Sequence, residues 1–159
     1  MPKSDEIEDG MALDDPNRMY VDYLLLADGA QVQGGKLYIL GGGWDRLQFP
    51  SYPSTLPIGL AFGVRVPWNE TNRKHSFVIR GTSTDGNDEL FRAEGEFEVG
   101  RPPGVPQGMS QMFQMAAALP LNIPKPGTYV VEAEIDGGKA RRHLPFFAVE
   151  VHGMPTPQP

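Results

Sequence analysis

The 159-residue chain contains no cysteine. Disulfides, a thiolate metal site and a cysteine nucleophile are therefore all excluded. Basic residues are also scarce, because 14 Lys and Arg stand against 20 Asp and Glu, which gives a net charge of −6. Nucleic-acid binding relies on clustered basic residues that neutralise phosphates. The charge balance thus argues against a nucleic-acid partner.

Long apolar runs are missing as well. No stretch approaches the roughly 20 apolar residues that a membrane helix needs. The first ten residues, MPKSDEIEDG, are polar and lack the apolar segment of a signal peptide. We therefore expect a soluble, cytoplasmic protein without membrane insertion.

Glycine and proline, in contrast, are abundant, with 19 and 16 residues respectively. Such a density of helix breakers leaves little room for long helices and predicts an all-β protein. The polar residues 1–18 predict a flexible acidic tail, residues 19–152 one domain, and residues 153–159 a Pro-rich tail.

The stretch from Tyr20 to Leu47 is the one around which we expect the rest of the chain to be organised. Two short apolar segments, Tyr20–Ala27 and Lys36–Leu40, are typical of strands buried on both faces, with Asp28-Gly29 and Gly34-Gly35 as turns between them. Three glycines, Gly41, Gly42 and Gly43, then precede Trp44.

These three glycines have two interpretations. They could form a backbone nest for an anion such as phosphate. However, no G-x-G-x-x-G or phosphate-loop motif is present and no helix is expected to follow. We favour a structural role, a bulge or strand crossing with the Trp44 indole packed over the glycines.

Alternating apolar residues predict most of the other strands. Leu56–Val66 alternates large apolar residues with a second face that includes Gly59 and Gly63, which implies either a close neighbouring segment or an exposed face of small residues. Further strands are expected at His75–Ser83, Glu89–Val99, Thr128–Ile135 and Lys139–Val151, and we assign the ambiguous, Ala- and Met-rich Ser110–Leu121 to a strand. About eight strands with regular turns predict an antiparallel two-sheet β-sandwich, C2-like or immunoglobulin-like.

The segment LLLADGAQVQGGKLYILGGGWDRL at residues 24–47 resembles the opening of a family of small, uncharacterised bacterial proteins with L-L-x-A-D-x-A-Q and G-K-L-x-x-L-G-G-G-W motifs. The later G-T-Y-x-V-E-x-x-I-D-G and F-F-x-V segments are similar too. The resemblance implies a β-sandwich without an assigned enzymatic activity, and it transfers no catalytic residues.

Catalytic patterns are not found. The histidines His75, His143 and His152 lack metal-ligand spacing, no G-x-S-x-G is present, and the carboxylates of strand Glu89–Val99 share one solvated face, on which Leu90 and Arg92 also lie. We therefore expect that the protein is not an enzyme and that it needs neither a cofactor nor a bound metal.

Two groups of loop residues are candidate binding sites. Asp85, Asn87, Asp88 and Asp136 lie in turns and could bind calcium if those loops, with the ones that carry Asp28 and Asp45, meet at one end of the domain. Trp68 and Tyr52 could form a glycan platform or a protein-binding hot spot if they project outward.

The first functional hypothesis is a non-enzymatic module that binds another protein or itself, for example as a structural subunit of a bacterial or phage-like complex. The alternative is a ligand-binding domain for calcium or a glycan.

Overall fold

The computed structural model describes residues 15–153. This part of the chain is all-β, as expected, with nine strands where about eight were predicted and a single 3-10 turn at Trp68–Glu70. The strands are β1 (Tyr20–Gln33), β2 (Lys36–Gly42), β3 (Arg46–Phe49), β4 (Ser54–Val66), β5 (Lys74–Ser83), β6 (Glu89–Glu98), β7 (Gln111–Ile123), β8 (Gly127–Ile135) and β9 (Ala140–Glu150). Apart from residues 15–18 and Gly153, the two predicted tails lie outside the described residues.

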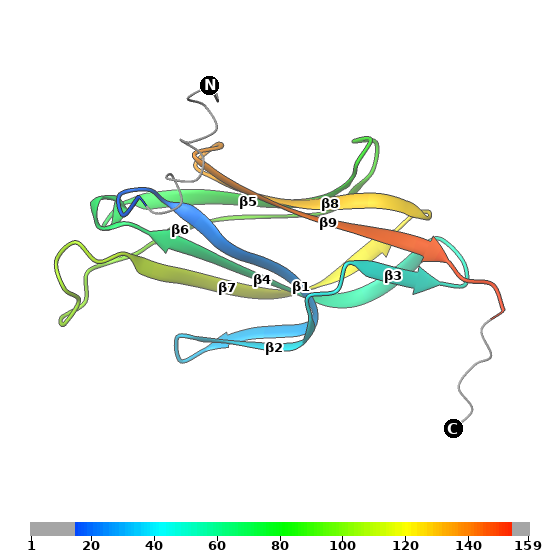
Figure 1. The fold of residues 1–159 in the computed structure, drawn as a ribbon, viewed down its shortest axis with the longest axis horizontal. Coiled ribbons are helices and arrows are strands. Elements are labelled where there is room, and N and C mark those ends of the chain that lie inside the picture. The colour runs from blue at the N-terminus through cyan, green and yellow to red at the C-terminus, as the bar shows by residue number, and fades with distance from the viewer. Residues whose placement is uncertain (1–14, 154–159) are drawn as a thin grey trace, which may run out of the picture.

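The strands form two sheets. Sheet A has the order β2-β1-β4-β7, and sheet B has the order β3-β9-β8-β5-β6. In Figure 1, β5, β8 and β9 lie above β4 and β7, and β2 lies below them, on the side away from sheet B. All neighbouring strands are antiparallel except β3 and β9, which pair in parallel. The wholly antiparallel prediction missed this pair because the four-residue β3 is too short to show a periodicity.

Both sheets contribute to a single core. The predicted alternation of β4 is confirmed, because its large apolar residues from Ile58 to Val66 are fully or almost fully buried. Phe77 and Ile79 of β5 are buried in the same cluster, together with Val131 of β8. Each fully buried side chain of this size is worth about 1.5–3 kcal/mol, so this cluster is the main source of stability.

The ambiguous segment at residues 110–121 is a strand, as predicted. β7 pairs with β4 along its whole length, from Val66↔Gln111 to Ser54↔Ile123. This continuous pairing overrides the helical propensity of its alanines and methionines. Pro120 is tolerated because β7 is an edge strand.

Leu90 of β6 points to the opposite face from the one predicted. Leu90 was expected on the solvated face, but only 7% of it is exposed. The pairing of β5 with β6 shifts register between Gly81 and Thr82 and leaves Leu90 without a partner. Because of this irregularity the Leu90 side chain points toward the core. Arg92 and Glu94 are exposed, as predicted.

No helix within residues 15–153 is long and apolar enough to cross a membrane.

Candidate interaction surface

β1 is longer than predicted and belongs to two pairings. Its first half pairs with β4, from Tyr20↔Arg65 to Ala27↔Gly59. Its second half pairs with β2, from Gly29↔Leu40 to Gln33↔Lys36. The prediction of a turn at Asp28-Gly29 is therefore wrong, and only Gly34-Gly35, with φ of 58° and 74°, forms the two-residue turn of the hairpin.

The β1–β2 hairpin, residues 28–42, packs on the face of sheet A that points away from sheet B (Figure 1). A Cβ on Gly59 would lie 2.5 Å from the Ala30 backbone nitrogen. At the other end of the hairpin, the Gln114 side-chain amide of β7 donates to the Gly35 carbonyl at 2.9 Å, and the Tyr23 hydroxyl donates to the Gln114 side-chain oxygen at 2.7 Å. Of the two readings of the glycine-containing face of β4, the close approach of another segment is correct.

β2 carries three exposed apolar side chains, which we call the hairpin patch. The exposed fractions are 56% for Tyr38, 38% for Ile39 and 75% for Leu40. The prediction that Lys36–Leu40 is buried on both faces is therefore wrong. β2 has one neighbouring strand, and nothing in the described part of the chain pairs with its other edge.

The hairpin patch is shallow and open. Tyr38 lies opposite Gln31, and Leu40 lies opposite Gly29, so no side chain across the strand covers Leu40. These residues, with Ala30 and Ile39, line a depression of about 420 Å³. Its wide, open form suits a flat macromolecular contact better than the enclosure of a small ligand.

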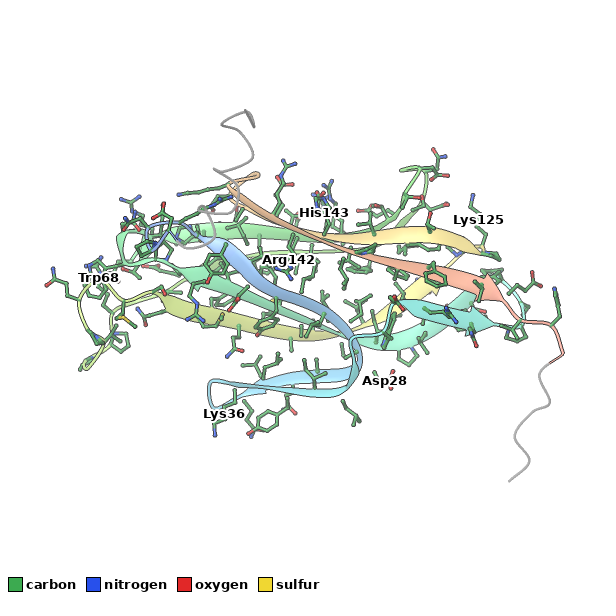
Figure 2. All side chains as sticks on the ribbon, viewed as in Figure 1. Asp28, Lys36, Trp68, Lys125, Arg142 and His143 are labelled. Atoms are coloured by element: carbon green, nitrogen blue, oxygen red, sulfur yellow. The ribbon has the colours of Figure 1, made fainter. Side chains whose placement is uncertain are left out.

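Two opposite charges mark the ends of the hairpin. Figure 2 shows Lys36 next to the turn and Asp28 at the bend where the hairpin leaves the sheet. The Asp28 carboxylate lies directly over Gly41, because a Cβ there would meet its oxygen at 2.3 Å. A negative charge in this place opposes the binding of phosphate to the glycines.

The side chains that surround Gly41–Gly43 and Trp44 are consistent with a structural role for these residues. Gly41 and Gly43 adopt φ of 60° and 83°, which favours glycine. The space above Gly41 and Gly42 is taken by Asp28 and Ile39 rather than by the indole, so that detail of the prediction is wrong. Trp44 is half-buried and packs edge-on against Phe146, with 6.3 Å between the ring centroids.

The structure does not bring Trp68 and Tyr52 together. They flank opposite ends of β4, whose 13 residues separate them by about 40 Å. The Tyr52 hydroxyl donates to the Val149 carbonyl at 2.5 Å, and the Arg101 guanidinium lies 4.0 Å from the centre of the Trp68 ring. Both side chains are half-buried in these contacts and do not form one platform.

The predicted calcium ligands are also divided between two ends. Asp85, Asn87 and Asp88 follow β5, whereas Asp136 follows β8, which runs antiparallel to β5. The Asp85 carboxylate accepts hydrogen bonds from the Ser83 hydroxyl and the Asn87 amide, which lower the pKa of Asp85 and make this an ordinary turn. Among residues 15–153, no group of three or more His, Cys, Asp or Glu side chains could hold a metal ion.

A buried polar cluster was not predicted. Only 3% of His75 is exposed, and its Nδ1 lies 2.7 Å from Asp136 Oδ2 while its Nε2 lies 2.8 Å from the Glu70 carbonyl oxygen. The Lys139 ammonium forms an ion pair with the Glu70 carboxylate. Because both imidazole nitrogens are engaged and shielded from solvent, His75 is a structural link between these two loops and not a general base.

The same cluster shifts the acidity of Asp136. Partial burial raises the pKa of its carboxyl, but the hydrogen bonds from His75 and the Ser76 amide lower it, and the net pKa lies below the ordinary value. No local motif could have revealed this arrangement, because His75 and Asp136 are 61 positions apart.

The basic residues Arg141, Arg142 and His143, which follow the β8–β9 turn, are exposed. Figure 2 shows His143 on the outer side of sheet B, where its Nε2 lies 2.6 Å from Glu132 Oε2. Arg80 donates to the same carboxylate at 2.9 Å. Burial raises the pKa of Glu132, but these two contacts lower it below its usual value. The partners are local carboxylates, and this face has the features of an exposed charged sheet surface.

Comparisons with known proteins give a family but no activity. No curated protein matches the chain. A family model described as a family of unknown function, DUF6941, matches residues 22–148, which include the hairpin patch and both sheets. The chain therefore belongs to this family of unknown function, DUF6941.

Proposed function

We propose that this protein is a non-enzymatic assembly module whose copies associate through the hairpin patch. The observation that carries the proposal is the exposure of Tyr38 and Leu40 on a strand with an open edge. Exposed apolar residues on an unpaired edge are a hazard that proteins normally remove with charges or a covering segment.

A second edge strand provides the contrast. β6 carries Glu94, Glu96 and Glu98 on its exposed side, and these like charges discourage pairing with another copy. β2 has no such charges between Leu37 and Leu40. Burial of side chains the size of Tyr38 and Leu40 is worth about 1.5–3 kcal/mol each, which favours association at this edge.

Several finer features belong to the same proposal. We class the two sheets and their shared core as a β-sandwich, and we place the protein in the cytoplasm. A role as a structural subunit of a bacterial or phage-like complex fits a small module that acts by association. The absence of catalytic spacing in the sequence supports a role other than that of an enzyme.

The test is light scattering across a concentration series with the full chain and a Tyr38→Ser/Leu40→Ser variant. We expect the average mass of the wild-type protein to rise above the monomer mass with concentration, and the variant to remain monomeric. A matched control, Val78→Ser, changes a half-buried apolar residue on the outer side of sheet B and should associate like the wild type. A wild-type monomer at every concentration, or equal association of all three proteins, would overturn the proposal.

A further inference from the structure

The free edge of β2 differs from the other sheet edges in the described residues. β3 has only four residues, and β6 carries the row of glutamates. β7 lies against β6, because Phe113 stacks on Phe97 with 4.3 Å between ring centroids. β2 offers seven residues with an apolar centre, and no strand from residues 15–153 lies beyond it.

We propose that a second copy of this chain adds its own β2 to this edge, antiparallel and around a two-fold axis at Ile39. This inference rests on the assembly role proposed above and names the surface and the register of the contact. The pairing would join the two hairpins into one four-stranded ribbon, β1-β2-β2-β1.

Charge complementarity points to a second copy as the occupant. Lys36 and Asp28 lie at opposite ends of the hairpin (Figure 2). An antiparallel two-fold brings each Lys36 to the end of the ribbon that carries the Asp28 of the partner, whereas a parallel pairing would set Lys36 against Lys36. Because each chain has a net charge of −6, a surface whose charges balance is where two copies can approach without repulsion.

The register follows from symmetry and length. An axis perpendicular to the ribbon requires that one residue lie opposite its own copy, and only Ile39 in that position pairs all seven residues of Lys36–Gly42. Tyr38 then lies opposite Leu40, an aromatic and aliphatic pair of the kind that stabilises neighbouring strands. Lys36 lies opposite Gly42, one position from the Gly41 that the Asp28 carboxylate covers.

A strand pair of this length buries less surface than a standard protein interface. The dimer should therefore be concentration-dependent rather than permanent, and a covalent probe is the appropriate way to detect its geometry.

Disulfide cross-linking is a suitable probe, because the chain has no cysteine and any disulfide must involve an introduced residue. Opposed residues of antiparallel strands have Cα atoms about 4.5–5.5 Å apart, within the disulfide range. Ile39→Cys should therefore form a covalent dimer under mild oxidation of the full chain. Leu37→Cys is the matched control, since its two copies would lie about 13 Å apart along the strands. A mixture of Tyr38→Cys and Leu40→Cys should give a covalent heterodimer.

A charge exchange tests the same geometry without oxidation. Lys36→Asp or Asp28→Lys alone should weaken association roughly tenfold, because each places like charges across the two-fold. A mixture of the two variants should restore association, since every cross-copy pair is again of opposite charge. Arg18→Asp, an exposed residue before β1, makes the same charge change as Lys36→Asp and should have no such effect.

The outcomes separate this inference from the function on which it rests. A concentration-dependent dimer that is cross-linked equally by Leu37→Cys and Ile39→Cys, or by neither, would overturn β2 pairing and leave the assembly role standing. A strictly monomeric wild-type protein would overturn both. Selective cross-linking at Ile39 with restoration in the mixed charge variants would establish the pairing.

Discussion

Gly59 shows how a single missing side chain positions a whole hairpin. The backbone of Gly29 and Ala30 lies where a Gly59 side chain would be, with the nearest atom 2.5 Å from the ideal Cβ. Because the obstacle is backbone, no side-chain rotation can relieve the contact. The packing of the hairpin on sheet A therefore depends on glycine at this position.

Replacement of Gly59 by alanine should lower the free energy of unfolding by about 1–3 kcal/mol, the usual cost of overpacking. Urea denaturation measures the loss. Gly29→Ala is the matched control from the other side of the same contact, because an added Cβ there has no atom within 4 Å. Equal stabilities of the two variants would show that the hairpin backbone does not pack closely against Gly59 of β4.

Asp136 gives the protein a predictable response to acid. Its carboxylate is held by His75 and the Ser76 amide, and its folded pKa lies below its unfolded value. The stabilisation is therefore present above the ordinary aspartate pKa of about 4 and is lost as the pH falls through the folded value.

We expect Asp136→Asn to be less stable than the wild type by about 1–3 kcal/mol at neutral pH, the usual cost of unsatisfied buried partners. The difference should shrink below about pH 4, as the wild-type carboxylate becomes protonated. Urea midpoints measured from pH 7 to pH 3 test this, with Glu98→Gln as a control on the exposed side of β6. A difference that does not change with pH would mean that the charge of Asp136 is not what stabilises the cluster.

At the scale of the element, β1 and β2 differ in what their apolar residues do: those of β1 before the hairpin stabilise the fold, whereas most of those of β2 face solvent. Leu26 and Leu40 are both leucines in sheet A, yet 0% of the first and 75% of the second is exposed. Only the first removes apolar surface from water when the chain folds. The hairpin patch should therefore contribute little to stability.

Leu26→Ala should cost about 2–5 kcal/mol, because it leaves a cavity in the core. Leu40→Ser should change stability by less than about 0.5 kcal/mol, as is usual for exposed positions. Thermal or urea unfolding at low protein concentration compares them. A large loss for Leu40→Ser would reveal an intramolecular contact that covers the patch and would remove it as a docking surface.

For the whole molecule, charge determines how closely two copies approach. Residues 1–14 contain one Lys and five Asp or Glu, so a chain that begins at Asp15 has a net charge of −2 in place of −6. If the hairpin patch is the contact, removal of this segment lowers the repulsion between copies without removing any contact.

The truncated chain should therefore associate at least as tightly as the full chain in the same light-scattering series. Deletion of the C-terminal residues 154–159, which contain no charged side chain, serves as the control. Weaker association after removal of residues 1–14 alone would assign the contact to the acidic segment and not to the hairpin.

The sequence alone determined the fold class and most of the strands. The alternation from Ile58 to Val66 predicted which large side chains of β4 lie in the shared core, because adjacent side chains of a strand point to opposite faces. The turns at Asp85–Asp88 and Asp136–Gly138 were also recognisable, since glycine and aspartate favour these conformations locally. These are short-range properties that a few neighbouring residues specify.

Only the tertiary structure decided what lies against each face and edge. Leu37–Leu40 has the composition of a buried strand, but Tyr38, Ile39 and Leu40 are exposed because β2 has no second neighbouring strand within residues 15–153, which its own residues do not encode. The pairing of His75 with Asp136 and the separation of Trp68 from Tyr52 depend in the same way on sheet order. Local sequence specifies which side chains share a face, whereas contacts between distant strands specify whether that face is covered.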